Sequence, residues 1–244
     1  MDYQSENAQT IDRWVDEGWQ WGVPISHDAF VDAQHGSWNI LLTPTKPVPH
    51  EWVGDVRGKR VLGLASGGAQ QMPVMAALGA QCTVLDYSSR QCEREYEVAD
   101  REGYDIEVIQ ADMTQPLPFA DESFDLIINP VSNCYIEQVK PVFRECYRVL
   151  KPGGSLIGGY DNGINYIFDN EETTLTYALP FNPLHVRGSC CSTKTPACSS
   201  RTRSTNRSAA SSKRDSHCAR CMRTRTGRGI CTNTMCRPSW PRGV

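Results

Sequence analysis

The chain has 244 residues, of which 39% are hydrophobic and 22% charged, and its formal net charge is −3. That length suits one large domain or two small ones, with enough apolar side chains for a core. No apolar run approaches the ~18 residues of a membrane-spanning helix, so the composition excludes an integral membrane protein. The first residues are acidic and polar, unlike a secretory signal, and the sequence predicts a cytoplasmic protein.

The last sixty residues differ sharply in composition from the rest. Beyond Leu184 lie 13 of the 25 Lys and Arg residues and one acidic residue, which gives this tail a charge of +12 against −15 for residues 1–184. The tail holds seven of the eleven cysteines and no Leu, Phe or Tyr. Such a segment buries too little apolar surface to offset its ordering entropy, so we expect residues 185–244 to be disordered. The other cysteines are expected to be small core residues of a protein from a reducing compartment: Cys82, Cys92, Cys134 and Cys146.

Residues 1–58 are predicted to form an irregular N-terminal lid segment with one short helix near residues 11–19. Prolines at positions 44, 47 and 49 predict an extended connector after it. Five of the six tryptophans lie in this segment, at positions 14, 19, 21, 38 and 52. They are expected either to pack the lid against the following domain or to wall a ligand pocket.

From residue 59 onward, short apolar strands alternate with helical segments. Strands are expected at 60–65, 81–86, 106–109, 124–128 and 155–158. Helices are expected to end at Leu78, to run from Ser88 or Ser89 to a stop at Gly103, and to span 139–150, followed by a turn at 153–154. This alternation predicts an α/β domain over residues 59–184, built on a doubly wound parallel sheet covered on both faces.

Two features follow the first two strands of this sheet. The first strand leads into a turn of small residues, from Gly63 to Ala69, where backbone can approach a ligand closely. The second strand ends in Asp86, whose carboxylate can accept hydrogen bonds from both hydroxyls of a ribose. Either feature alone is equally compatible with a tight turn and a solvated carboxylate. Together, on consecutive strands, they indicate a cofactor that contains a nucleoside.

The sequence of the turn distinguishes between such cofactors. A dinucleotide-binding dehydrogenase needs G-x-G-x-x-G, so that a pyrophosphate can sit on the helix N-terminus. Residues 63–69 are G-L-A-S-G-G-A, which does not match, and the turn contains no arginine. S-adenosyl-L-methionine carries no phosphate and needs room for a methionine arm, which suits a looser turn of small residues.

Further segments of residues 60–160 carry a family resemblance. They are Ala111-Asp112-Met113, Leu117-Pro118-Phe119, Phe124-Asp125-Leu126-Ile127 and Arg148-Val149-Leu150-Lys151-Pro152-Gly153-Gly154. With the turn and Asp86, they resemble the class I S-adenosylmethionine-dependent methyltransferases, of the small-molecule methyltransferase domain type. Residues 24–27, 42–47 and 130–135 are similar to an uncharacterised bacterial branch of that family. The resemblance implies a Rossmann-like sheet and transfer of a methyl group to a small-molecule acceptor.

The resemblance also implies a set of cofactor-binding positions: Gly63, Ala65, Gly67, Asp86, Asp112, Met113 and Asn129. The three turn residues would line the methionine and ribose side of the cofactor through their backbone, and Asp86 would bind the ribose hydroxyls. The turn departs from the family pattern in lacking an acid at Gly63 and glycines at Ala65 and Ala69. The missing acid removes one indirect contact to the methionine ammonium group, and weaker binding is expected.

At the other end of the cofactor, the resemblance implies that Asp112 accepts from the adenine amino group beside Met113, and that Asn129 lies near the transferred methyl. Methyl transfer needs a general base only when the nucleophile arrives protonated. The candidate bases are His27, His35 and Asp161. The acceptor, any metal and the oligomeric state are not predicted.

The family's sheet ends with two further strands, and no strand pattern follows residue 190. Codons compatible with residues 231–241 permit an apolar strand in another reading frame, so we interpret the tail as the product of a frameshift near residue 185. The alternative is a basic module: Cys218, Cys221, Cys231 and Cys236 with His217 as a zinc site, or the arginines as a nucleic-acid-binding surface. Nucleic-acid binding is not favoured, because the tail is poor in aromatic residues. A nicotinamide oxidoreductase is a further alternative, but the Leu-Pro-Phe and Leu-Lys-Pro-Gly-Gly segments have no role in such an enzyme.

Overall fold

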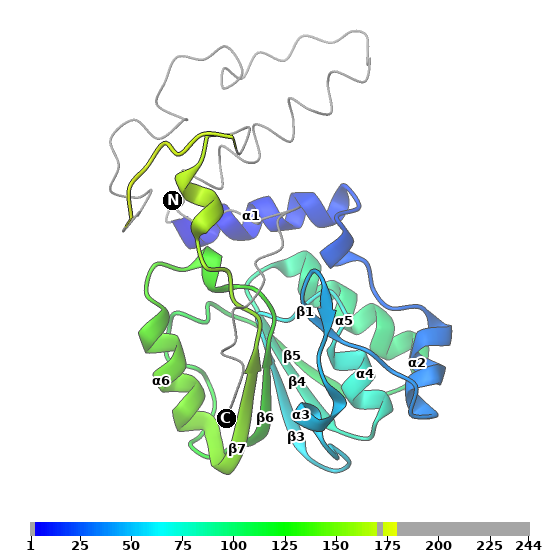
Figure 1. Ribbon diagram of the computed structural model, residues 1–244. Helices are drawn as coiled ribbons and strands as arrows, with labels where there is room; N and C mark the ends of the chain where they lie inside the picture. Colours follow the sequence, from blue (N-terminus) through cyan, green and yellow to red (C-terminus); the bar gives the residue numbers. More distant parts are fainter. Residues whose placement is uncertain (1–2, 170–172, 180–244) are drawn as a thin grey trace, which may run out of the picture. The chain divides into compact units, whose positions relative to one another are not determined.

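The computed structural model describes residues 3–169 and 173–179, and the chain divides into two compact units (Figure 1). The larger unit comprises residues 8–133 and 138–160, and the described residues of the smaller unit are 3–7, 134–137, 161–169 and 173–179. The expectations for the tail, including the frameshift, the disorder and the zinc or nucleic-acid alternative, lie outside the described residues. No helix among the described residues is long and apolar enough to cross a membrane.

The larger unit is built on a parallel sheet of five strands. These are β3 (Arg60–Leu64), β4 (Gln81–Asp86), β5 (Ile106–Gln110), β6 (Phe124–Asn129) and β7 (Leu150–Gly158). Their order is β5-β4-β3-β6-β7, and all neighbours are parallel. The chain therefore winds outward from β3 in both directions, which confirms the predicted doubly wound Rossmann-like sheet.

One expected turn is instead part of a strand. The glycine pair at 153–154 was predicted to separate helix from strand, but β7 already begins at Leu150, paired with Phe124. The register between β6 and β7 shifts before Leu126 pairs with Ser155. The extra residues of β7 are accommodated at this irregularity, and glycines are common at such positions because they tolerate the distorted backbone.

Three helices connect the strands, namely α4 (Met72–Ala77), α5 (Ser89–Glu102) and α6 (Val139–Val149). Right-handed crossovers place α4 and α5 on one face of the sheet and α6 on the other, as Figure 1 shows. The caps of α5 are as predicted. The Ser88 hydroxyl accepts from the Gln91 N–H at 3.1 Å, and Gly103 ends the helix in the left-handed conformation with φ +73°.

The N-terminal segment is more regular than predicted. It contains α1 (Tyr3–Asp16), the 3-10 turn η1 (Gln20–Gly22), α2 (His27–Gln34), β1 (Leu41–Thr43), β2 (Lys46–Pro47) and α3 (His50–Val53). Of the prolines expected to form an extended connector, Pro47 lies in β2 of the β1–β2 ribbon. Ser26 caps α2, because its hydroxyl accepts from the Ala29 N–H. The short helix expected near residues 11–19 is the 14-residue α1, which begins and ends earlier. The prediction of an irregular segment after it was wrong because the later elements bury at most two residues each, too few for a visible period.

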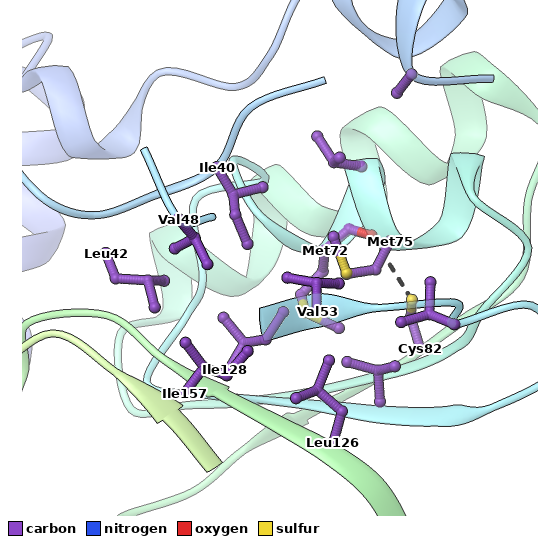
Figure 2. Packing of buried hydrophobic residues seen from close by; sticks show 14 of the residues in the cluster. Ile40, Leu42, Val48, Val53, Met72, Met75, Cys82, Leu126, Ile128 and Ile157 are labelled. Carbon is purple, nitrogen blue, oxygen red and sulfur yellow. Dashed lines mark hydrogen bonds between the residues drawn. The ribbon is translucent and has the colours of Figure 1, made fainter. Parts of the chain in front are cut away.

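Part of this segment supplies the core on the α4 face of the sheet. Figure 2 shows Ile40, Leu42, Val48 and Val53 packed over α4 and the strands. Their partners are Met72 and Met75 of α4 and Cys82, Leu126, Ile128 and Ile157 of the sheet. Each such side chain contributes about 1.5–3 kcal/mol when fully buried. The lid segment is thus an integral part of the core.

The four body cysteines are free and buried, which confirms the prediction that they are small core residues. The Cys82 thiol lies 3.6 Å from the Met72 carbonyl oxygen, and burial raises its pKa. Of the tryptophans, Trp14 is buried with its ring 5.6 Å from that of Trp19, whereas Trp52 is half exposed. Trp14 therefore has the packing role that the sequence predicted as one alternative. The indole N–H of Trp19 is buried and has no hydrogen-bond partner among the described residues.

The described parts of the smaller unit are the first turn of α1, residues 134–137 and residues 161–169 and 173–179. The 3-10 turn η2 (Asn133–Tyr135) ends within it, and η3 (Ile164–Ile167) lies in it. Asn7 donates to the Tyr135 carbonyl at 3.0 Å, and the Tyr3 hydroxyl accepts from the Glu137 N–H at 3.2 Å. These bonds hold the start of α1 to residues 134–137.

Candidate functional site

The turn between β3 and α4 combines three residues in the left-handed region. Ala65, Gly68 and Ala69 have φ of +48°, +97° and +54°. A non-glycine residue in this conformation costs about 1–3 kcal/mol and persists only where its surroundings impose it. Such strain concentrates at functional sites, and the turn follows the carboxyl end of the central strand, where open α/β sheets bind their ligands.

Four backbone N–H groups of this turn, those of Ala65, Gly67, Gly68 and Ala69, have protein acceptors. Ala65 donates to the Leu85 carbonyl at 2.7 Å, and Gly67 donates to the Asp86 carboxylate at 2.9 Å. Two donate to α5: the Gly68 N–H to the Gln91 carbonyl at 3.0 Å, and the Ala69 N–H to the Glu95 carboxyl group at 2.7 Å. These four N–H groups are therefore engaged by protein, although the sequence predicted that the backbone of the turn approaches the ligand.

Two glycines in the turn are required by close packing. A Cβ atom at Gly67 would lie 2.6 Å from the Gln91 Cβ and 3.0 Å from the Asp86 Oδ2. One at Gly68 would lie 2.5 Å from the Trp21 carbonyl oxygen, which belongs to η1. The turn is thus held between α5 and the N-terminal segment, and neither neighbour leaves room for a side chain.

Gly63, inside β3, is a glycine for a different reason. A Cβ atom there would meet the Met72 Cγ at 2.8 Å and its Sδ at 2.9 Å. The Met72 side chain, fully buried, fills the volume beside the strand. The family often has an acid at the position of Gly63. In this chain the Met72 side chain occupies the space that such an acid would need.

Asp86, at the end of β4, is the most buried carboxylate along this edge of the sheet. Its two oxygens accept from the backbone N–H groups of Gly67 and Ser88, each at 2.9 Å. Burial raises its pKa, the backbone N–H groups of Ser88, Gly67 and Tyr87 oppose that rise, and the nearby Asp12 adds to it. A carboxylate has about four lone-pair positions, so Asp86 retains the capacity to accept at least one further hydrogen bond.

Asp12 of α1 binds the start of α5. Its carboxylate accepts from the Ser88 hydroxyl at 2.5 Å, the Ser89 hydroxyl at 3.1 Å and the Arg90 N–H at 3.1 Å. A carboxylate is favourable at a helix N-terminus, where unpaired N–H groups carry partial positive charge. Ser88 consequently joins two carboxylates, donating its N–H to Asp86 and its hydroxyl to Asp12.

Asp112 and Met113 follow the carboxyl end of β5, next to Asp86 across the sheet edge. The Ala111 N–H donates to the Asp86 carbonyl at 3.0 Å, which fixes this proximity. The Asp112 carboxylate accepts from the N–H and hydroxyl of Thr114, at 2.8 and 2.7 Å, and Met113 is buried. Asp112 is therefore oriented by its own loop, with lone pairs to spare.

An ion pair on α6 secures the rest of this loop. The Arg148 guanidinium donates to the carbonyls of Leu117 and Phe119, at 3.0 and 2.7 Å. It also pairs with Glu145 at 2.7 Å, and Glu145 accepts from the Leu117 N–H. The hydrogen bonds from Arg148 hold the pKa of Glu145 below its usual value. The Leu-Pro-Phe and Arg-Val-Leu segments, far apart in sequence, are thus joined by hydrogen bonds of Arg148 and Glu145.

Asn129, at the end of β6, is buried between neighbouring strands. Its amide nitrogen donates to the Leu64 carbonyl at 2.7 Å and to the Ser132 hydroxyl at 2.9 Å. Both bonds tie the end of β6 to the end of β3 and to the following loop. The structure therefore places Asn129 at the predicted sheet edge, with its amide N–H groups engaged by protein.

One candidate base, His27, lies away from this edge. His27 lies at the start of α2 and contacts Glu102 at 2.8 Å, at the opposite end of α5 from Ser88. The 14 residues of α5 span about 20 Å, so His27 is remote from Asp86. His35 ends α2 and bonds the Val31 carbonyl, and Asp161 belongs to the smaller unit, where it accepts from the Gly163 N–H.

Sequence reasoning missed Glu95, Asp12 and the Arg148–Glu145 pair. Glu95 carried a usable signal, because it shares the buried stripe of α5 with Gln91, Cys92, Val98 and Ala99. A charged residue in such a stripe predicts a buried bond. Asp12 carried none, since its partners lie 76–78 positions away.

Comparison with known proteins agrees with this arrangement. Residues 62–158 match the family described as methyltransferase domain. Over 167 residues the chain is 42% identical to the uncharacterized methyltransferase YbaJ of Bacillus subtilis, covering 68% of this chain and 66% of that protein. It is 36% identical over 133 residues to a demethylmenaquinone methyltransferase of Renibacterium salmoninarum, covering 54% of this chain and 51% of that one.

Among solved structures, an S-adenosylmethionine-dependent methyltransferase from Mesorhizobium loti is 26% identical with a TM-score of 0.43. That match covers 48% of this chain and 54% of the other. The chain spans about half to two thirds of the curated relatives named above.

Proposed function

Because this chain belongs to the class I S-adenosylmethionine-dependent methyltransferases, we propose that the carboxyl edge of its sheet binds S-adenosyl-L-methionine and that the protein methylates a small-molecule acceptor. One observation carries the proposal: a strained turn and the side chains of Asp86 and Asp112 meet at the ends of three adjacent strands.

The residues present fit such a cofactor. Asp86 can accept from ribose hydroxyls through the lone pairs that Gly67 and Ser88 leave free, and Asp112 can accept from an adenine amino group. Met113, buried beside Asp112, offers a polarisable thioether to a ring. These assignments follow the family pattern position by position.

The turn supports this cofactor over a nicotinamide dinucleotide. A pyrophosphate needs backbone N–H donors at the helix N-terminus. Here the N–H groups of Gly67, Gly68 and Ala69 already bond to protein, and α4 begins without a side-chain cap. A turn whose N–H groups are engaged by protein suits the uncharged and cationic parts of S-adenosylmethionine better than it suits a pyrophosphate.

When bound, S-adenosylmethionine supplies an electrophilic methyl group on a sulfonium. In this proposal the chain binds and orients: Asp86 and Asp112 fix the two ends of the nucleoside, and the backbone of Gly63, Ala65 and Gly67 lines the methionine arm. Asn129 holds the end of β6 against β3 beside that arm. Catalysis then comes from alignment of the acceptor and exclusion of water, which can supply about 7–11 kcal/mol of the barrier.

We further propose that the protein acts in a bacterial cytoplasm. All four described cysteines are free and buried, as suits a reducing compartment, and the first curated relative is bacterial.

Calorimetric titration with S-adenosylhomocysteine tests the ribose assignment. Replacing Asp86→Ala removes an acceptor of charged hydrogen bonds, worth about 1–3 kcal/mol, so affinity is expected to fall at least several-fold. Asp100→Ala, on the exposed face of α5, is the matched control and should bind as the unaltered chain does. Equal affinity for both variants would contradict the assignment.

A further inference from the structure

Glu95 is the one carboxylate buried completely within the core, with an exposed fraction of 0%, among the described residues. It lies on the inner face of α5, one turn beyond Gln91, and its Oε1 accepts from the Ala69 N–H at 2.7 Å. Its Oε2 has no hydrogen-bond partner among the described residues. A buried carboxylate is costly, so its retention here calls for a role.

The bond that Glu95 makes is placed at the most constrained point of the turn. Gly68 and Ala69 are consecutive left-handed residues, and α5 accepts the N–H groups of both, through the Gln91 carbonyl and the Glu95 side chain. The carbonyl of Ala69 accepts a hydrogen bond from the Ile25 N–H at 3.0 Å. The Glu95 bond thus holds the end of the turn where it leads into α4.

The surroundings of Glu95 favour its neutral form. The titratable groups that act on it or feel it are Asp86 and Cys82 of β4, Cys92 of its own helix, and Tyr104 just beyond α5. None of these is a cation. Burial raises the pKa of Glu95 to about 8, although the Ala69 N–H opposes that rise. A neutral carboxyl group leaves one buried O–H without a hydrogen-bond acceptor in the described part of the chain. Burying that O–H costs far less free energy than burying an unpaired negative charge.

We propose that Glu95 is a positioning residue for the cofactor: in its neutral form it holds the Ala69 N–H from inside the protein and so keeps the turn in the shape that admits S-adenosylmethionine. The inference rests on the proposed function, because it assigns the turn to that cofactor. Glu95 acts through the backbone of Ala69 and is not itself a contact of the ligand.

Three variants of the full chain test the role. Glu95→Met keeps the length of the side chain and removes the acceptor, Glu95→Gln keeps a neutral acceptor, and Glu97→Met alters the exposed face of the same helix. Hydrogen exchange over residues 65–72 and calorimetric titration with S-adenosylhomocysteine are measured for each.

We expect Glu95→Met to exchange the amides of residues 68–69 at least tenfold faster and to bind S-adenosylhomocysteine at least tenfold more weakly. Glu95→Gln should stay within threefold of the unaltered chain in both measurements, and Glu97→Met should match it. Unchanged exchange and affinity in Glu95→Met would overturn the proposal. If the unaltered chain does not bind S-adenosylhomocysteine, the proposed function fails, while the exchange measurement still decides the role of Glu95.

The pH dependence gives a second readout. Since the folded pKa of Glu95 lies above its unfolded value, the folded chain keeps a proton that the unfolded chain has lost, and stability falls as pH rises from about 4.5 to about 8. The melting temperature of the unaltered chain relative to Glu95→Gln should therefore decline over that interval and level off above it. Parallel profiles would overturn the neutral form, and this comparison remains decisive if Glu95→Met does not fold.

Discussion

The turn at residues 65–69 and the loop at residues 112–121 lie at the same edge of the sheet but are held by different means. The turn is fixed by backbone N–H groups that bond to buried acceptors, with helices close on both sides. The loop is fixed from a distance by one guanidinium, whose side chain is 30% exposed, and by the local bond of Asp112 to Thr114.

This difference separates two ways of building a ligand site. The turn obtains its shape by excluding side chains, so any added atom meets backbone or a packed helix. The loop obtains its shape from charge-assisted hydrogen bonds near solvent, which are screened by salt and can be lost one at a time. We therefore expect substitutions in the turn to be severe and those at the loop to be graded and salt-dependent.

The largest effect is expected from Gly68→Ala. The substitution combines a left-handed conformation with a Cβ placed 2.5 Å from the Trp21 carbonyl oxygen. Strain and overpacking should together lower the free energy of unfolding by about 3–5 kcal/mol. Urea denaturation measures it. Gly36→Ala is the matched control, since Gly36 has φ +88° and open space around it, and should cost only about 1–2 kcal/mol. Equal costs would show that close packing does not constrain the turn.

A smaller effect is expected from Arg148→Met. It removes the guanidinium donor from the Phe119 carbonyl and one of two donors from the Leu117 carbonyl, and it should cost about 1–2 kcal/mol, after allowance for partial exposure. The cost should shrink in high salt, and hydrogen exchange should quicken over residues 113–119 but not over 65–69. Arg94→Met removes an exposed pair with Glu97 and should cost about 0.3–0.5 kcal/mol. If both arginine variants lose the same stability, the loop does not depend on Arg148.

The smallest effect is expected from Ala69→Gly. It relieves left-handed strain of about 1–2 kcal/mol but adds backbone entropy of about 0.5–1 kcal/mol to the unfolded chain, so thermal unfolding should change little. Ala76→Gly, in the helical conformation of α4, has no strain to relieve and should cost about 1 kcal/mol. A cost at Ala69 as large as that at Ala76 would mean that the alanine is not strained.

The larger elements could be predicted from the sequence because each carried its own local signal. The bounds of β4 and the two caps of α5 agree with expectation, since a short run of buried residues, a serine cap and a terminal glycine are local properties. The short elements α2, α3 and the β1–β2 ribbon could not be predicted, because tertiary packing of a few residues holds them.

The site was predictable in outline and not in detail. The positions of Asp86, Asp112 and Asn129 at strand ends follow from strand boundaries alone. Which groups each one bonds depends on neighbours from elsewhere in the chain, as with the bond from Asn129 to the Leu64 carbonyl. Likewise, no local pattern shows that the N–H groups of the turn are directed into the protein.

The contact between position 63 and Met72 couples these two positions. A side chain at position 63 would overlap the Met72 Cγ at 2.8 Å, so an acid there requires a displaced Met72 side chain or a smaller residue at position 72. Neither substitution is neutral without the other: the acid alone clashes, and the smaller residue alone opens a void. The effects of substitutions at positions 63 and 72 on stability are therefore not additive.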